Sequence, residues 1–240
     1  MGDCGEICSA EEGFSREEQD IYAARSFDRA LKAQAAGKFK SEIVPVPVKG
    51  RSGVVMVDKD EVKPTTLDTL KKLKPCFSPA KSVTAGNSST INDGASALVL
   101  MSEERAKKQN IPILAYIRGW ADAETDPDHF AIAPALAIPK ALAKAGVKTS
   151  EIDFVEINEA FAVVALANMK RLGLDEKKVN VYGGGVSLGH PIGNSGSRII
   201  VTLLNVLNQE GGKIGVAGIC NGGGGASAIV IEKAGPSSKL

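Results

Sequence analysis

From residue 92 onward, short apolar stretches of strand length alternate with longer stretches whose apolar residues recur at helical spacing. We expect strands at 93–101, 112–123, 152–158 and 178–184, and two more around a glycine turn within 213–233. Helices are expected at 102–110, 133–146, 159–173 and 195–212, the last three ending at glycine. This βαβαβαββ order from residue 112 on predicts a layered α/β domain with a largely parallel sheet.

The first 90 residues lack this alternation. Ser15 and Glu18 have the spacing of a capping box, which predicts a helix that runs to about Ala36 and is closed by Gly37. Two short strands are expected, the first confined to a sheet edge by its two prolines, at 41–48 and 53–61. The rest is polar and interrupted by prolines, so we interpret residues 1–90 as a layered insertion rather than a self-sufficient core.

Composition excludes several classes of protein. The chain has 240 residues, 43% of them hydrophobic and 24% charged, which is enough apolar material for a real core. The net charge is +1, and the Lys and Arg residues are spread along the chain, so nucleic acid is not an expected partner. No apolar run approaches the roughly 18 residues of a transmembrane helix, and no N-terminal signal is visible, so no membrane partner is expected.

The cysteines and the last residues concern redox chemistry, metals and location. Four cysteines show no disulfide framework, and Cys4 and Cys8 have no second ligand pair that would indicate a metal site. The chain ends in Ser238-Lys239-Leu240, the tripeptide that a peroxisomal receptor reads. We expect a peroxisomal location, with a cytoplasmic one as the alternative.

Polar, reactive side chains stand where three predicted strands end. Asn158 ends one strand, His190 follows another, and Cys220 ends a third. In α/β sheets such carboxyl ends form the ligand site, so we expect the three side chains to lie together. Each has a simpler reading: Asn158 as a helix cap, His190 as a structural histidine, and Cys220 as an inert buried thiol.

Glycine surrounds two of these residues. His190 lies within GGGVSLGHPIGNSG (183–196), and Cys220 precedes NGGGG. Glycines admit a ligand to the backbone, and their N–H groups can stabilise a thiolate or form an oxyanion hole. A neutral imidazole nearby can donate to an oxyanion or polarise a thiol. This favours a catalytic site over a flexible loop.

Two other patterns point to different chemistry. GVSLG (185–189) matches the nucleophile elbow of serine hydrolases, but no helix follows Ser187 at once and no distant later histidine exists. ADAETDPDHF (121–130) alternates carboxylates as a calcium loop does, but has Pro127 where glycine is needed. We expect neither function.

The motifs NEAFA (158–162), GGGVSLGHPIGNSGSR (183–198) and ICNGGGGASA (219–228) together resemble the thiolase family, most closely its acetoacetyl-CoA thiolases. The stretches TAGNSSTINDGASALVLM (84–101) and FAIAP (130–134) match as well, and the resemblance covers essentially the whole chain. It implies a thiolase fold and an acetyl-CoA C-acetyltransferase, which condenses two acetyl-CoA molecules to acetoacetyl-CoA and runs the reverse thiolysis. CoA and acetyl-CoA would be substrates, with no required cofactor.

The resemblance also implies residue roles. His190 would activate the nucleophilic cysteine and bind the thioester oxygen, and Cys220 would be the acid/base that removes an α-proton. Asn158 would hold a water in the first oxyanion hole, and the N–H of Gly222 would serve the second. Phe161 would line the acyl pocket.

Further positions correspond to substrate and cation contacts in the family. Ser89 and Met1 match residues that touch the pantetheine arm of CoA. The backbone cage for potassium in potassium-dependent members corresponds to Ala85, Gly86, Ser88 and Val186. Phe27 stands where those members have a tyrosine.

The family places its acyl-accepting cysteine in a C-S-S-G-like motif, which no cysteine here has. We therefore expect the second half of a thiolase, inactive alone: a partial loop domain (1–90), the last elements of the N-terminal domain (91–111), a C-terminal domain (112–235) and a tail (236–240). Whether the chain is a fragment, the product of an alternative start or a short isoform stays open.

The alternative functions are a 3-ketoacyl-CoA thiolase of β-oxidation and a non-catalytic CoA-binding module. The complete enzyme would be a homodimer or homotetramer.

Overall fold

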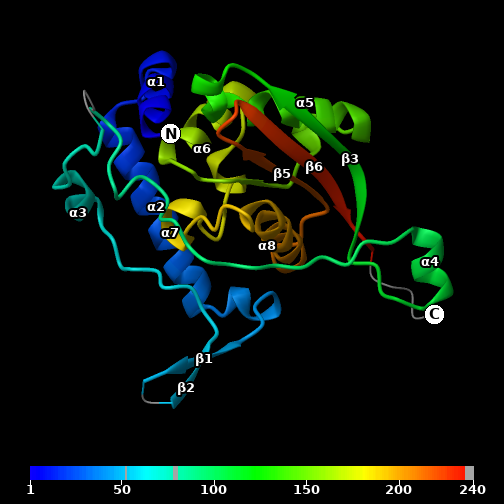
Figure 1. Cartoon of the computed structure of the whole chain (residues 1–240). Coiled ribbons are helices and arrows are strands. Elements are labelled where there is room, and N and C mark those ends of the chain that lie inside the picture. Colours follow the sequence, from blue (N-terminus) through cyan, green and yellow to red (C-terminus); the bar gives the residue numbers. More distant parts are fainter. Residues whose placement is uncertain (52, 78–80, 236–240) are drawn as a thin grey trace.

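The computed structural model describes residues 1–51, 53–77 and 81–235 (Figure 1). The predicted peroxisomal signal, Ser238-Lys239-Leu240, lies outside them. A four-stranded sheet is at the centre, in the order β3-β6-β5-β4. Its strands are β3 (Ala115–Glu124), β4 (Phe154–Ile157), β5 (Ile214–Cys220) and β6 (Gly225–Lys233).

The sheet is mixed, so the prediction of a largely parallel sheet is wrong. Only β4 and β5 run parallel, whereas β6 is antiparallel to both β5 and β3. The tight turn at 221–224 sends β6 back beside β5, and β3 then pairs with the free edge of β6 from Ala115 opposite Lys233 to Glu124 opposite Gly225.

Helices cover both faces of this sheet, which confirms the layered α/β architecture (Figure 1). One face packs against α5 (Pro134–Ala145) and α6 (Ala162–Leu172), and the other against α8 (Ser195–Gln209). Successive side chains of β5 point to opposite faces, so Val216 joins the first layer and Ala217 the second. Between α6 and α8 comes α7 (Gly185–Leu188), and α4 spans Glu103–Lys108.

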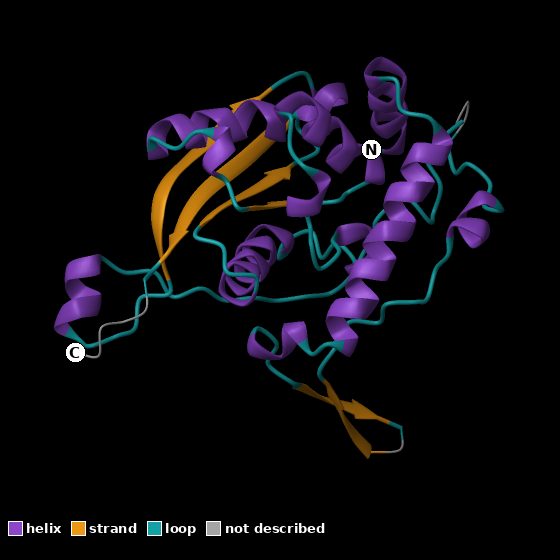
Figure 2. Cartoon of the chain, turned by 180° about the vertical axis from the view of Figure 1, so that it is seen from behind, coloured by secondary structure: helices purple, strands orange, loops and turns teal. Residues whose placement is uncertain are grey.

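The N-terminal part is built around one long helix. Ser15 and Glu18 close the predicted capping box, and α2 runs over Arg16–Ala35 with Gly37 in the left-handed conformation just beyond it. The helices α1 (Gly2–Glu12) and α3 (Leu67–Lys71) flank it. The two predicted strands form a hairpin, β1 (Val46–Gly50) and β2 (Gly53–Val57), which projects away from the sheet and helices (Figure 2).

Two of the strands predicted from the sequence, at 93–101 and 178–184, are not present in the structure, so these predictions are wrong. Residues 93–101 run extended past α8 towards α4, with Val99 84% and Leu100 71% exposed (Figure 1). No strand in the described part of the chain lies beside them, so their apolar pattern has no partner. At 178–184, Asn180 adopts a left-handed φ of 48° and its side chain pairs with the backbone N–H and C=O of Ile157, each at 2.8 Å. Backbone pairing with β4 is limited to one parallel bridge, Val155 with Val179, and beyond it this side chain takes the place of the ladder that a fifth strand would form.

The predicted helices are confirmed within a few residues. The largest differences are three residues: α6 begins at Ala162 rather than 159, because residues 158–161 form the candidate site instead, and α8 ends at Gln209 rather than at the glycine at 212. Short 3-10 helices add to the connections at Lys38–Ser41, Pro127–Ile132, Thr149–Glu151 and Glu176–Lys178. No helix in the described ranges combines the length and apolarity needed to cross a bilayer.

Candidate active site

The parallel pair β4–β5 brings two of the predicted residues to one edge. Asn158 immediately follows β4, and its N–H donates to the Gly218 carbonyl at 3.0 Å, two residues before Cys220 at the end of β5. Carboxyl ends of parallel neighbours meet at the same side of a sheet, as expected from the sequence. Asn158 does not cap α6, since the residue at that position is Phe161, so the capping interpretation is wrong.

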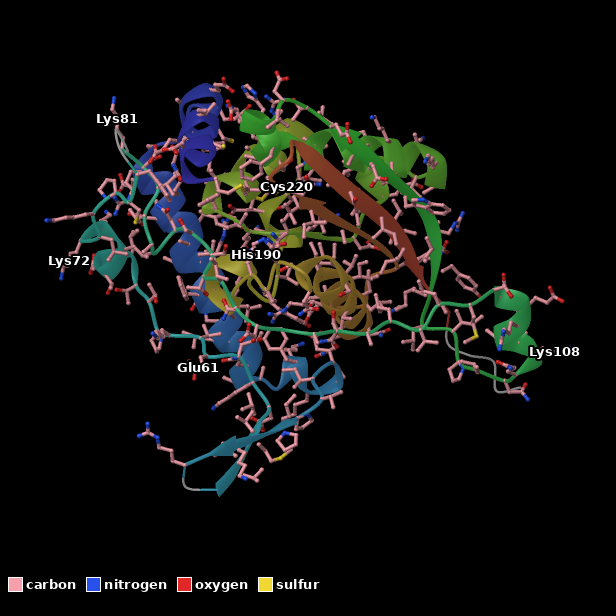
Figure 3. All side chains as sticks on the ribbon, in the orientation of Figure 1. Glu61, Lys72, Lys81, Lys108, His190 and Cys220 are labelled. Carbon is pink, nitrogen blue, oxygen red and sulfur yellow. The ribbon has the colours of Figure 1, made fainter. Side chains whose placement is uncertain are left out.

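His190 lies near this edge on the connection between α7 and α8 (Figure 3). Its backbone N–H donates to the Thr90 carbonyl at 2.9 Å, and its Nε2 lies 3.4 Å from Nδ2 of Asn158. Its Nδ1 lies 2.6 Å from Oγ of Ser195. Burial lowers the pKa of His190 below its ordinary value of 6.5, so the imidazole is neutral at pH 7.

The loop at 87–90 fastens these residues together. The Asn87 carbonyl accepts the N–H of Ala162 at 2.8 Å, and Ser89 donates both its N–H and its hydroxyl to the Ala160 carbonyl, each at 3.0 Å. Since the same loop supplies the Thr90 carbonyl to His190, it positions both the NEAFA segment and the imidazole. The hydroxyl of Ser89, predicted to touch CoA, is half-buried and already donates within the chain.

Glu159, which with Asn158 ends the predicted strand, is 1% exposed and has a role that the sequence did not predict, as a hub of hydrogen bonds. Its carboxylate accepts hydrogen bonds at 2.7–3.1 Å from side chains of α2 and the 180 segment and from the backbone of α7: Tyr22, Ser26, Asn180 and Val186. A buried carboxylate with this many donors is well satisfied. It ties the NEAFA segment to α2 and α7, and its place directly after Asn158 was the only signal in the sequence.

The glycines before His190 serve contacts within the chain. A Cβ on Gly184 would lie 2.4 Å from the Glu159 carboxyl carbon. Gly189 has a φ of +90°, and a Cβ there would lie 2.2 Å from Oδ1 of Asn92. The sequence predicted that glycine lets backbone approach a ligand, whereas at these two positions it lets the chain approach its own side chains, the buried Glu159 and the exposed Asn92.

The turn after Cys220 leaves one backbone donor free. The N–H groups of Asn221, Gly223 and Gly224 donate within the turn, at 2.8–3.2 Å. Gly222 is exposed, and its N–H has no acceptor among the described residues. The prediction of a run of free glycine donors therefore reduces to Gly222, the residue to which the resemblance gave an oxyanion role. The Sδ of Met1 would lie 3.0 Å from a Cβ on Gly222, so Met1 reaches this site as well.

Cys220 is 8% exposed and belongs to the same core cluster as Phe161 and Cys8. Burial raises the pKa of the Cys220 thiol to about 12, with only a backbone hydrogen bond opposing the shift. Burial therefore favours the thiol as the resting form of Cys220, and the stabilised thiolate stays a prediction. As a thiol Cys220 can donate a proton, and it can act as a base only after losing that proton.

The hydrolase pattern is settled by its neighbours. Ser187 is buried in α7, where its hydroxyl contacts Ser26 and the Gly184 carbonyl rather than a histidine, so the hydrolase elbow is absent. Among the described residues no group of three His, Cys, Asp or Glu side chains could hold a metal ion, and the expectations for the 121–130 loop and for Cys4 with Cys8 stay predictions.

The predicted potassium cage has apolar neighbours. Val186 packs in a cluster with Leu70 and Phe27, and a Cβ on Gly86 would lie 2.4 Å from a Leu70 methyl carbon. Ser88 donates its hydroxyl to the Thr84 carbonyl at 2.6 Å, and Ala85 lies between them in the turn. Phe27 offers no hydroxyl where potassium-dependent members have a tyrosine, and the other four positions would offer backbone carbonyl oxygens. The potassium site therefore stays a prediction, and no step below uses it.

Comparison with known proteins agrees with this geometry. The family model "Thiolase, N-terminal domain" matches residues 1–104, and "Thiolase, C-terminal domain" matches residues 111–233. The chain belongs to the thiolase family. It is similar to acetyl-CoA acetyltransferase 2 of Arabidopsis thaliana, at 55% identity over 97% of this chain and 59% of that protein. The acetyl-CoA acetyltransferase of Schizosaccharomyces pombe is 51% identical over 97% of this chain and 60% of its own length.

Solved thiolases show the same fold. A human mitochondrial 3-ketoacyl-CoA thiolase superposes with a TM-score of 0.95 at 43% identity, covering 98% of this chain and 60% of that one. The acetyl-CoA acetyltransferase of Bacillus anthracis gives a TM-score of 0.94 at 46% identity, with the same coverage. This thiolase thus spans about three-fifths of the length of its relatives.

Proposed function

We propose that this chain carries the acid/base and oxyanion-hole part of an acetyl-CoA acetyltransferase, and that the acyl-accepting thiol is not among its four cysteines. The observation that supports this most directly is the meeting of Asn158 and His190, 3.4 Å apart, at the sheet edge where β5 ends in Cys220. The similarity to acetyl-CoA acetyltransferases over 97% of the chain supports the substrate.

In the thiolysis direction, an acyl-accepting thiolate attacks the keto carbon of acetoacetyl-CoA. The bond between that carbon and the α-carbon then breaks, and its electron pair passes to the α-carbon as the enolate of acetyl-CoA. Cys220 donates its thiol proton to that carbon, a step for which a pKa of about 12 suits the resting group. In condensation the same sulfur, as thiolate, removes the proton.

Both directions develop negative charge on a carbonyl oxygen. The side chains of His190 and Asn158 provide N–H donors at one position, and the Gly222 N–H provides another beside Cys220. Donors fixed in advance stabilise such an oxyanion without reorganising, and losing one typically costs about 10²–10³ in rate. Because His190 is neutral, one of its two ring nitrogens carries a proton, and that N–H can donate a hydrogen bond to the oxyanion.

The other cysteines are poor candidates for the acyl-accepting role. Cys8 is buried, and burial raises its pKa to about 12, so it holds its proton. Among the described residues, the side chains with polar atoms within 3.5 Å of the His190 ring nitrogens are those of Asn158 (3.4 Å) and Ser195 (2.6 Å), and no cysteine is one of them. The proposal therefore separates proton transfer, which this chain performs, from acyl transfer.

Deuterium exchange tests that separation. In alkaline D₂O, where part of the Cys220 thiol is ionised, the chain should exchange the α-protons of acetyl-CoA, because this needs a base and an oxyanion hole but no acyl acceptor. Cys220→Ala should lower the exchange rate at least about 100-fold, whereas Cys76→Ala, at an exposed site, should not change it. Exchange that persists in Cys220→Ala contradicts the base assignment. Robust acetoacetyl-CoA thiolysis by the 240-residue chain contradicts the missing acyl acceptor.

A longer substrate is the second candidate, since the human 3-ketoacyl-CoA thiolase superposes as closely as the acetyltransferase. Comparing α-proton exchange of acetyl-CoA with that of a medium-chain acyl-CoA decides between them. We expect acetyl-CoA to exchange faster. Calorimetry with CoA tests the non-catalytic binding alternative, which predicts binding without exchange. Dimer or tetramer formation stays a prediction, checked by light scattering.

A further inference from the structure

The hydroxyl of Ser195, the first residue of α8, lies between two acceptors. Its Oγ is 2.6 Å from Nδ1 of His190 and 3.1 Å from the Pro191 carbonyl oxygen. Ser195 is 2% exposed, so solvent does not compete for this hydroxyl. A serine hydroxyl has one proton and can donate it to only one acceptor at a time. Which acceptor receives it decides which nitrogen of His190 carries the ring proton.

The Pro191 carbonyl is already well supplied with donors. It accepts the backbone N–H of Asn194 at 2.7 Å and that of Ser195 at 2.9 Å, which together occupy its two lone pairs. The contact with His190 is also the shorter of the two made by the hydroxyl, and hydrogen-bond strength falls with distance. The hydroxyl proton therefore belongs to Nδ1.

We infer that Ser195 donates to Nδ1 of His190 and so holds the neutral imidazole as the tautomer with its proton on Nε2. The contact with Asn158 agrees with this assignment. At 3.4 Å, its Nδ2 is farther from Nε2 than the usual 2.9–3.0 Å of a hydrogen bond. Two N–H donors at this separation can converge on one shared oxygen.

This tautomer deepens the proposed function, on which its catalytic meaning rests. With the proton on Nε2, the resting His190 enters the reaction as a hydrogen-bond donor to the thioester oxygen. Ser195 is a positioning residue, because it acts only through His190. The direction of its single proton replaces the buried carboxylate that fixes the tautomer in many catalytic histidines.

The chain offers an unusually simple test, since His129 and His190 are its only histidines. With ¹⁵N-labelled histidine, two-bond ¹⁵N–¹H correlation spectra of the neutral form show which ring nitrogen carries the proton. For the unmodified chain we expect His190 to carry it on Nε2. In Ser195→Ala the share of the Nδ1–H form should rise about fivefold, as expected for losing a hydrogen bond of about 1 kcal/mol. His129 should not change.

Ser197→Ala is the matched control, because Ser197 lies in the same first turn of α8 and donates to the Asn194 carbonyl rather than to the ring. A proton on Nδ1 of His190 in the unmodified chain overturns the inference, even if no variant folds. So does a Ser195→Ala spectrum identical to the unmodified one, or an equal change in Ser197→Ala. The readout needs no substrate, so a correct tautomer with no deuterium exchange rejects the proposed function alone.

Discussion

The hydroxyl of Tyr22, in α2, donates a 2.7 Å hydrogen bond to the carboxylate of Glu159, the residue after Asn158. Burial beside this carboxylate raises the pKa of Tyr22 well above its ordinary value, so the phenol keeps its proton and stays a donor. The N-terminal helix layer and the edge that carries the candidate site are thereby joined through one buried oxygen.

Glu159→Gln should destabilise the fold by about 2–4 kcal/mol, because an amide NH₂ would replace an oxygen that accepts from surrounding donors. Urea unfolding measures this directly. Glu176→Gln is the control: Glu176 pairs with Arg25 and its side chain is 59% exposed, so its replacement should cost no more than about 1 kcal/mol. An equal loss of unfolding free energy in the two variants would show that the hydrogen bonds of Glu159 contribute no more to stability than a surface ion pair.

Gly189→Ala should cost about 1–3 kcal/mol and lower α-proton exchange, since the residue has a φ of +90° and its new methyl would meet Asn92. The backbone of His190 would have to shift with it. Gly193→Ala, in the same loop, meets nothing within 4 Å and should leave both stability and exchange almost unchanged. Urea unfolding and deuterium exchange test the pair, and a silent Gly189→Ala would contradict the constraint.

Asn180 and Asn110 both have a left-handed backbone, with φ of 48° and 53°. Alanine at either position carries a similar backbone cost. Asn180→Ala also removes the side-chain bonds to Ile157 and Glu159 and should lose about 2 kcal/mol more than Asn110→Ala. The difference between the two unfolding free energies isolates the side chain. No difference would mean that Asn180 contributes only its conformation.

Stability should fall in alkali. Burial raises the pKa of Cys8 and Cys220 from 9.0 to about 12. Between these values the native state binds more protons than the unfolded state, so the unfolding free energy decreases as pH rises. At pH 10 each thiol should account for a loss on the order of 1 kcal/mol relative to pH 7.

Urea unfolding at pH 7 and pH 10 measures that loss. The double variant, in which alanine replaces both Cys8 and Cys220, should show a flatter pH dependence of the unfolding free energy, although it is less stable than the unmodified chain at pH 7. Cys76→Ala, at an exposed position, should keep the full dependence. A dependence unchanged in the double variant would mean that other groups, such as Tyr22, cause the alkaline loss.

Local patterns in the sequence predicted what depends on neighbours along the chain. The capping box at Ser15 and the glycine that ends α5 are examples, and Asn158 and Cys220 met because strand ends collect at one edge. The strand predicted at 93–101 failed because an apolar run indicates burial but does not supply a partner. The strand at 178–184 failed because one side chain, Asn180, replaced backbone pairing beyond a single bridge.

The electrostatics of the site could not be predicted in the same way. The pKa of Cys220 depends on side chains far away in sequence that exclude water from β5. Ser195 could have been found, because it stands five residues after His190 at the start of a predicted helix. What the sequence could not show is that its hydroxyl points at the ring.

The pairing of β3 with β6 has a consequence for the order of events during synthesis. Ala115 pairs with Lys233, so β3 must wait for more than a hundred later residues before its partner exists. Contacts of such long sequence separation slow folding and prolong the exposure of unpaired edges. β5 gains its second neighbour only when β6 emerges, so Cys220 is shielded last. A ribosome-bound chain should acquire the active site only after its final strand has left the exit tunnel.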